Sequence, residues 1–168
     1  FRFTNNNKIA PVGFVGTGIL FSPFLYLGNL FNQIFNESIA EDVFNYQIFF
    51  YSMSSVIYFF LTYLFIYKTM KLIGYKLNKY KLLLIFSASG LPYYAFERFG
   101  MTHIAEVFTI SLLIYLLTSF YLDDTDSKIT ASLISPILLL YFLTRMSNFF
   151  IFLIPLIVKK YLQNSKKQ

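Results

Sequence analysis

The chain has 168 residues, of which 57% are hydrophobic and 13% charged, and its net charge is +6. Soluble domains carry about 25% charged residues, so this composition indicates an integral membrane protein and argues against a soluble globular one. The chain has no cysteine, which excludes a disulfide framework and a cysteine-based metal site. No basic stripe interleaved with exposed aromatic residues is recognisable, so nucleic-acid binding is not expected.

Residues 1–45 are predicted to form an outer-side loop with one juxtamembrane or re-entrant helical element. The run Ala10–Phe35 is apolar, but four glycines and Pro23 interrupt it. Such a run lies in the outer leaflet or, alternatively, crosses the membrane, and the flanking charges do not separate these alternatives. Because the chain begins with Phe1, we expect a fragment of a longer protein.

The rest of the chain, 46–168, is predicted to be an all-α transmembrane helix bundle with about five spanning helices. A helix needs about 20 apolar residues to cross a bilayer. Tyr46–Tyr67 and His103–Leu122 meet this length. Three further runs are shorter, and short hydrophobic helices are tolerated in a packed bundle. These are Lys81–Phe96, Ile129–Leu143 and Met146–Val158.

Clusters of lysine predict the orientation of the bundle. The segment Tyr67–Lys81 contains five lysines and the tail 159–168 contains four. Lysine and arginine are enriched in cytoplasmic loops, so both clusters are expected in the cytoplasm. An even number of crossings must then join them, which requires the apolar stretch 129–158 to be split at Arg145. The same map places Arg98 and Arg145 on the outer side.

The ionisable residues at membrane depth are the candidates for function. In a helix that begins near residue 101, His103 and Glu106 lie three residues apart and share a face. Arg145 lies between two apolar runs at the same outer level, and Glu97 and Arg98 occupy the preceding loop. A cavity that opens outward would hold these five side chains together.

Each candidate also has a structural interpretation. The Glu97–Arg98 pair is then a solvated loop pair, and His103 marks a helix start at the interface. Glu106 makes a structural hydrogen bond, and Arg145 extends to lipid head groups. The Tyr93–Tyr94 pair belongs to an interfacial aromatic belt or, alternatively, stacks on a ligand ring. One histidine without cysteine or a tight acidic cluster does not indicate a metal site.

Three segments, in order, resemble a known family. They are "NNNKIAPVGFVGTGILFSPFLYLG" (Asn5–Gly28), "GLPYYAFERFGMTHIAEVFTISLLIYLL" (Gly90–Leu117) and "YFLTRMSNFFIFLIPLIV" (Tyr141–Val158). They resemble segments of GT-C-type polytopic membrane glycosyltransferases, which include protein O-mannosyltransferase-like and aminoarabinose-transferase-like enzymes. The chain departs from the pattern at Met146 and Ser147, where Pro and Gln are common in the family.

The resemblance implies transfer of a sugar from a polyprenyl-phosphate donor to an acceptor on the outer face. In the family, an acidic residue of the first outer loop acts as the general base, and that loop would largely precede Phe1. Glu97 and Glu106 are the catalytic candidates that remain in this chain. No cofactor is expected, and a divalent metal is left open but not indicated. The candidate substrate-binding residues are Lys8, Tyr93, Tyr94, Arg98, His103, Arg145 and Asn148.

Two other functions remain open at this stage. The bias toward Phe, Tyr, Ile, Asn and Lys is also typical of non-enzymatic membrane subunits, whose polar residues would meet partner membrane chains. A transporter of lipid-linked sugars would need broken helices with polar linings near the membrane midplane. Gly90–Pro92 is the candidate break. In all three cases membrane lipids are partners of the chain.

Overall fold

The structure is a computed structural model that describes residues 2–3, 9–10, 15–35, 46–76, 78–122 and 127–165. It is helical apart from one antiparallel pair, in which β1 (Arg2–Phe3) pairs with β2 (Ile9–Ala10). The predicted all-α class is therefore confirmed. The helical elements are α1 (Val15–Ile34), α2 (Tyr46–Leu72), α3 (Lys79–Ser87), the π-helix η1 (Tyr93–Glu97), α4 (Thr102–Leu122), α5 (Ser127–Thr144), the 3₁₀-helix η2 (Met146–Leu153) and α6 (Ile154–Ser165).

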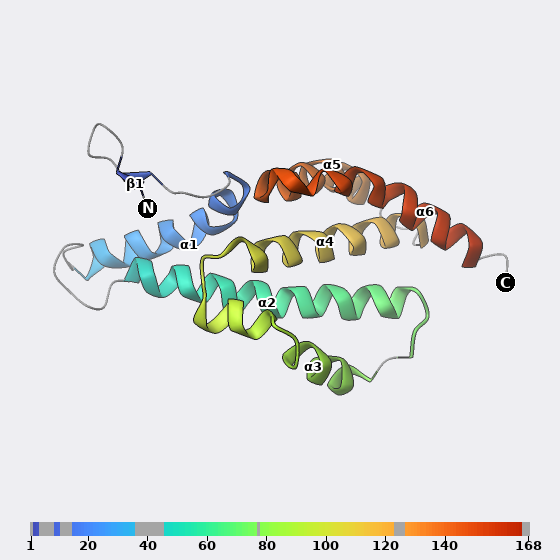
Figure 1. Ribbon diagram of the computed structural model, residues 1–168, viewed down its shortest axis with the longest axis horizontal. Coiled ribbons are helices and arrows are strands. Elements are labelled where there is room, and N and C mark those ends of the chain that lie inside the picture. Colours follow the sequence, from blue (N-terminus) through green and yellow to red (C-terminus); the bar gives the residue numbers. More distant parts are fainter. Residues whose placement is uncertain are drawn as a thin grey trace.

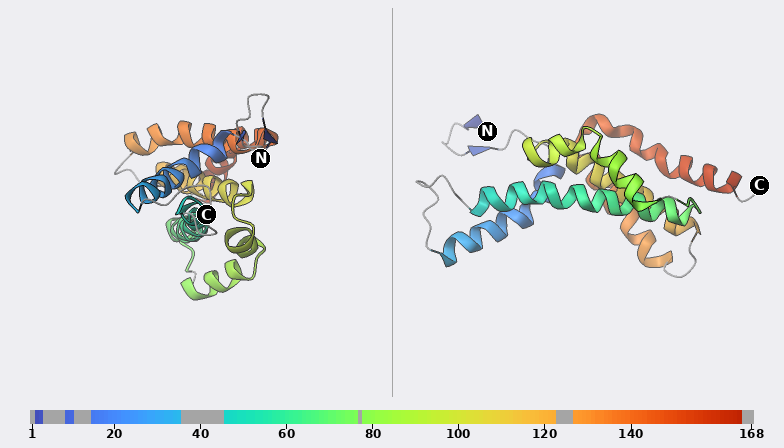
Figure 2. Two further views of the ribbon diagram at one scale, coloured as in Figure 1. Left: turned by 90° about the vertical axis from the view of Figure 1, so that its left-hand side faces the viewer. Right: turned by 90° about the horizontal axis from the view of Figure 1, so that it is seen from below.

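The elements form an elongated bundle (Figure 1). Helices α2 and α4 run in the same direction, and the segment with α3 and η1, which connects them in sequence, leads back alongside α2 (Figure 1). Helix α5 is inclined to the long axis, as the two further views show (Figure 2). One end of the bundle, which we call the lysine end, comprises Tyr67–Lys81 and the end of α6. The opposite end, which we call the arginine end, comprises Tyr93–Glu106 and Arg145.

Two of the described helices, α2 and α4, are long and apolar enough to cross a membrane. This confirms the runs Tyr46–Tyr67 and His103–Leu122, but it is fewer than the five spanning helices predicted. The run Lys81–Phe96 is divided, because α3 ends after nine residues and the backbone turns at 88–90. The apolar part of α5 is shorter than a span, and the last run begins as a 3₁₀-helix before α6.

The predicted division at Arg145 is present. Helix α5 ends at Thr144, and Arg145 has extended backbone angles, with φ −164° and ψ 118°. The next helical residue is Met146, so the chain leaves the helical conformation for one residue. This single extended residue separates the two helical segments and brings the side chain of Arg145 to the arginine end.

Small polar residues contribute to the buried faces of α2 and α4, beside larger apolar ones. On α2, Ser55, Thr62 and Thr69 are buried and follow one another at seven-residue intervals, and on α4 Ser111 and Thr118 do the same. Small side chains at such spacing let helices approach closely. The hydroxyls of Thr62 and Thr69 donate to the carbonyl oxygens four residues earlier, at 2.7 and 2.8 Å. Their polarity is thus satisfied within their own helix, which suits an apolar environment.

Two glycines fix α1 against its neighbours. A Cβ atom at Gly16 would lie 2.5 Å from the backbone carbon of Leu143 in α5. A Cβ atom at Gly28 would lie 2.5 Å from the Cα atom of Gln47 in α2. Only glycine allows backbones to approach this closely. Helix α1 therefore packs directly on both helices, at positions twelve residues apart along its length.

Helix α1 is continuous although Pro23 lies inside it. Proline has no N–H group and leaves the carbonyl oxygen four residues earlier, that of Ile19, without its helical partner. The hydroxyl of Ser22 donates to this oxygen at 2.9 Å. The buried hydroxyl of Tyr58 in α2 donates to the next carbonyl oxygen, that of Leu20, at 2.6 Å. These two hydroxyls provide donors for carbonyl oxygens near the proline, which accounts for the continuity of the helix.

Candidate functional site

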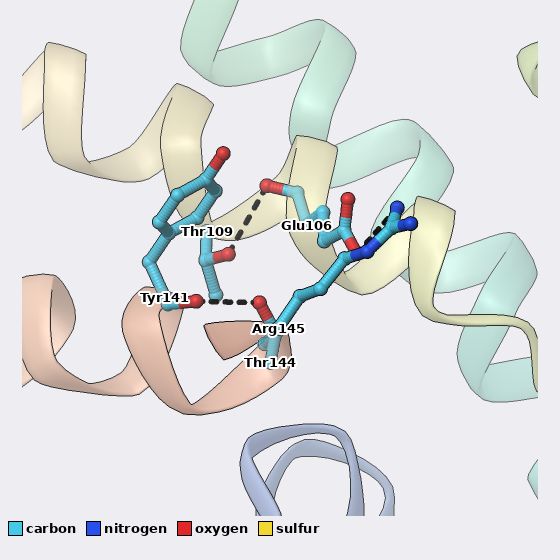
Figure 3. A network of polar contacts seen from close by, with 5 residues as sticks. All are labelled: Glu106, Thr109, Tyr141, Thr144 and Arg145. Atoms are coloured by element: carbon cyan, nitrogen blue, oxygen red, sulfur yellow. Dashed lines mark hydrogen bonds and ion pairs between the residues drawn. The ribbon is translucent and has the colours of Figure 1, made fainter. Parts of the chain in front are cut away.

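The contact between Glu106 and Arg145 joins α4 to the junction of α5 and η2. One guanidinium nitrogen of Arg145, Nη1, lies 4.0 Å from Oε1 of Glu106. This distance is that of an ion pair and is too long for a hydrogen bond. The Glu106 side chain is 15% exposed and that of Arg145 is 46% exposed. The carboxylate is therefore sheltered by the bundle, while the guanidinium extends outward from it (Figure 3).

The carboxylate of Glu106 is incompletely satisfied. Its buried Oε1 atom has no hydrogen-bond donor among the residues that the structure describes. Two hydroxyls lie nearby in Figure 3, but both donate to backbone carbonyl oxygens. The Thr109 hydroxyl donates to the Ala105 carbonyl at 2.7 Å, and the Thr144 hydroxyl donates to the Tyr141 carbonyl at 2.6 Å. A buried carboxylate oxygen without a donor is costly, so Glu106 is an unusual residue within the bundle.

The π-helix η1 arranges two tyrosines and an arginine. The backbone N–H of Arg98 donates to the carbonyl oxygen of Tyr93, five residues earlier, at 2.9 Å. Single π-turns of this kind are frequent at functional sites. The same register lets Nε of Arg98 donate to the Tyr93 hydroxyl at 2.9 Å. The ring of Tyr94 contacts that of His103, with centroids 4.6 Å apart. The first turn of α4 is thereby joined to η1.

Gly100 sets the geometry of the link between η1 and α4. Its φ angle is +86°, a region that glycine adopts readily. A Cβ atom at this position would lie 2.6 Å from the hydroxyl oxygen of Tyr51 in α2. The link therefore turns sharply against α2 before Thr102 begins the next helix. Gly100 and Tyr51 are not among the site residues predicted from the sequence, although a glycine directly before a helical run is a turn signal.

The other predicted site residues lie as follows. Glu97 is exposed and forms no ion pair with any residue in the described part of the chain. Lys8 lies outside the described residues, and so does the side chain of Asn148, whose backbone belongs to η2. The structure thus brings Glu106 and Arg145 into contact, and it joins Tyr93 to Arg98 and Tyr94 to His103. The rings of Tyr93 and Tyr94 contact each other, with centroids 5.4 Å apart, so the last two pairs form one cluster. Among the described residues, no ion pair or hydrogen bond joins this cluster to the side chains of Glu106 and Arg145.

Among the described residues, no group of three or more His, Cys, Asp or Glu side chains could hold a metal ion. The site is instead one sheltered carboxylate with three basic side chains around the same end of the bundle. Compared with known proteins, the chain matches no family model, and no curated protein or solved structure is significantly similar to it.

Proposed function

We propose that this chain is part of a membrane glycosyltransferase that moves a sugar from a polyprenyl-phosphate donor to an acceptor on the outer face of the membrane. The observation that carries the proposal is the Glu106–Arg145 pair, in which an extended-backbone arginine meets a sheltered, incompletely satisfied carboxylate. The resemblance of three segments to GT-C-type enzymes supports the same function. The arginine end would face outward, and the lysine-rich segments 67–81 and 159–168 would lie in the cytoplasm.

Exposed apolar surface supports an environment of lipid. In the most apolar 18-residue stretch of α2, only 28% of the residues are buried within the bundle. In the corresponding stretch of α4, 50% are buried. Large side chains on the outer surface of α2, such as Ile48, Phe60 and Leu64, are 45–57% exposed. A soluble protein rarely leaves such a continuous apolar surface in water. In a bilayer the same surface contacts acyl chains, and this accounts for helices that are apolar on all sides.

Arg145 has the properties of a phosphate ligand. Its guanidinium has five N–H donors, and within the described residues its contact is a single carboxylate oxygen at 4.0 Å. The remaining donors can form a two-pronged contact with a phosphate group. When the bond between sugar and phosphate breaks, negative charge develops on the phosphate, and a fixed cation in a dry site stabilises that charge. Arg98 and His103 belong to the same end of the bundle.

Glu106 would act on a hydroxyl group. Its side chain is 15% exposed, and we propose that its carboxylate accepts the proton of a sugar or acceptor hydroxyl. In the transfer, the acceptor oxygen attacks the anomeric carbon and gives its proton to a carboxylate. The bond from that carbon to the phosphate oxygen breaks, and its electron pair stays on the phosphate. Glu106 or Glu97 would act as the general base, unless an acidic residue from another part of the protein takes this role.

The test is the lipid that the purified chain retains. The chain would be purified in mild detergent and analysed by native mass spectrometry, beside Arg145→Ala, Glu106→Gln and a control, Lys159→Ala. We expect polyprenyl phosphate on the parent chain and on the lysine variant, and its loss from Arg145→Ala. Glu106→Gln should keep the lipid but lose transfer of sugar. Absence of polyprenyl phosphate from all four proteins would refute the assignment.

A non-enzymatic membrane subunit is the second candidate. It is favoured by apolar exposure on η2, where Phe149, Phe150 and Phe152 are 51–65% exposed in one short segment. A partner membrane chain would cover such a surface. Recovery of a stoichiometric partner, with no polyprenyl phosphate, would select this function. A lipid-linked sugar transporter would instead bring polar side chains of the break at 88–92 to the membrane midplane, which depth-dependent labelling would reveal.

A further inference from the structure

The lysine end carries a second concave site, separate from the Glu106–Arg145 pair. A cavity of about 280 Å³ opens there and is lined by Tyr67, Met70, Lys71, Gly74, Tyr75 and Lys76. All six belong to the last turns of α2 and the turn that follows it. The lining thus combines two ammonium groups and two phenolic hydroxyls with an apolar wall. This is the combination that suits an amphiphilic molecule with an anionic head.

The cavity has a defined backbone. Gly74 has φ +85°, and its N–H donates to the Lys71 carbonyl at 3.1 Å. The N–H of Tyr75 donates to the Met70 carbonyl at 2.9 Å. These two bonds are a Schellman motif, which ends the helix and occupies two of its last carbonyl oxygens. The turn therefore holds the side chains of Lys71 and Lys76 on either side of a fixed corner.

The two cavity lysines have no charged or aromatic partner among the described residues. Lys68 lies over the ring of Tyr115 at 5.7 Å, and Lys79 lies over that of Tyr80 at 5.1 Å. Lys71 and Lys76 are exposed and have no ion pair or ring contact with any described residue. The stretch from residue 46 to residue 96 contains no Asp or Glu at all. Uncompensated positive charge at a concave surface attracts an anion.

Two features oppose an anion here. The C-terminus of α2 carries the negative end of the helix dipole, although two lysine charges outweigh its half charge. In the sequence, Asp123, Asp124 and Asp126 follow α4, which ends at this end of the bundle, and they lie outside the described residues. Because these aspartates carry negative charge, the experiment below includes a variant without them.

We infer that this cavity binds the phosphate head group of an anionic membrane phospholipid, with Lys71 and Lys76 contacting the phosphate and Tyr67 and Met70 beside the glycerol and upper acyl chains. Membranes present anionic lipids on their cytoplasmic leaflet, where basic segments next to spanning helices attract them. Tyrosine is enriched at the same depth. The inference requires a membrane environment and does not require the chain to be a transferase.

The experiment measures lipid preference by native mass spectrometry. The full chain in detergent would be titrated with phosphatidylglycerol or with phosphatidylcholine. The test variant is Lys71→Gln/Lys76→Gln. The matched control is Lys159→Gln/Lys160→Gln, which removes the same charge from exposed positions of α6 that do not line the cavity. A third variant replaces the three aspartates by asparagine, and circular dichroism verifies that all remain helical.

We expect the parent chain to prefer phosphatidylglycerol, and the cavity variant to bind it about tenfold more weakly, because each lysine near an anionic head group contributes appreciably. The α6 control should bind as the parent does, and the aspartate variant should bind more tightly. If the cavity variant and the control variant lose the same affinity for phosphatidylglycerol, the effect depends on net charge alone and the inference is overturned. Displacement of the lipid by millimolar inorganic phosphate would assign the cavity to a soluble anion and also overturn it. Arg145→Ala should leave this binding unchanged, so the result is independent of the proposed transferase.

Discussion

The two ends of the bundle carry their charge in different ways. At the arginine end, the backbone sets the position of the charged group. Arg145 is a single residue with extended backbone angles between two helical segments, and its guanidinium lies near the sheltered carboxylate of Glu106. At the lysine end, Lys71 and Lys76 are exposed, on flexible side chains, and no described acidic residue accompanies them. If both proposals hold, we expect the first end to select its ligand by geometry and the second by charge.

The largest effect is expected where the backbone itself holds the arginine end. Gly16→Ala introduces a Cβ atom 2.5 Å from Leu143 and should lower the free energy of unfolding by about 2–3 kcal/mol, because backbone must move. Unfolding in detergent, followed by circular dichroism, measures this. The control is Gly18→Ala, since a Cβ atom there meets nothing within 4 Å and helix propensity alone should stabilise by about 0.5–1 kcal/mol. Equal effects of the two alanines would show that the α1–α5 contact does not form.

The next effect distinguishes the two kinds of charge. Arg145→Ala leaves the sheltered carboxylate of Glu106 without its cation and should cost about 1–3 kcal/mol of unfolding free energy. Glu106→Gln/Arg145→Ala should recover part of this loss, because the buried charge is gone. Arg98→Ala is the matched arginine control, and its exposed side chain predicts a change near zero. If the double variant is no more stable than Arg145→Ala alone, the two side chains are not coupled.

A smaller effect is expected between the two ends, at the contact of α1 with α2. Tyr58→Phe removes the buried hydroxyl that donates to the Leu20 carbonyl at 2.6 Å, and should destabilise by about 1 kcal/mol. Thermal unfolding of the purified chain measures the loss. Tyr26→Phe, at a tyrosine that is 64% exposed, serves as the control and should change little. If Tyr58→Phe leaves the stability unchanged, the Leu20 carbonyl needs no hydrogen-bond donor from α2.

The smallest effect is expected at the lysine end. Lys71→Gln/Lys76→Gln should change the free energy of unfolding by less than about 0.5 kcal/mol, because exposed charges without partners contribute little to stability. The same denaturation experiment applies. A loss as large as that of Arg145→Ala would show that these lysines hold the fold together, and the contrast between the two ends would disappear.

The sequence predicted the features that depend on composition. Long apolar runs located α2 and α4 to within a few residues, and charge balance located the break at Arg145. Composition did not reveal that the run Lys81–Phe96 is divided after Ser87, because the average hydrophobicity of a segment does not show where its backbone turns. It also treated the glycines of α1 as interruptions, whereas Gly16 and Gly28 are the contacts that let this helix pack.

The sequence predicted the residues of the candidate site better than the contacts between them. His103, Glu106 and Arg145 attract notice because charge is rare in an apolar chain. The contact between Glu106 and Arg145 depends on how α4 meets the end of α5, which one sequence without relatives does not specify. The pairing of Tyr93 with Arg98 depends on a π-turn, and no residue pattern of this chain predicted one. The proposed function accordingly rests on the chemistry of the pair and on the resemblance.

The glycine contacts of α1 have a mechanical consequence. Gly28 is pressed on the backbone of α2, and Gly16 on the peptide groups of Leu143 and Thr144, directly before Arg145. Backbone packed on backbone leaves no side-chain rotation to absorb displacement, so a shift of α1 at Gly16 must also shift the peptide groups of Leu143 and Thr144. The direction of the Arg145 side chain therefore depends on the position of α1 as well as on that of α5.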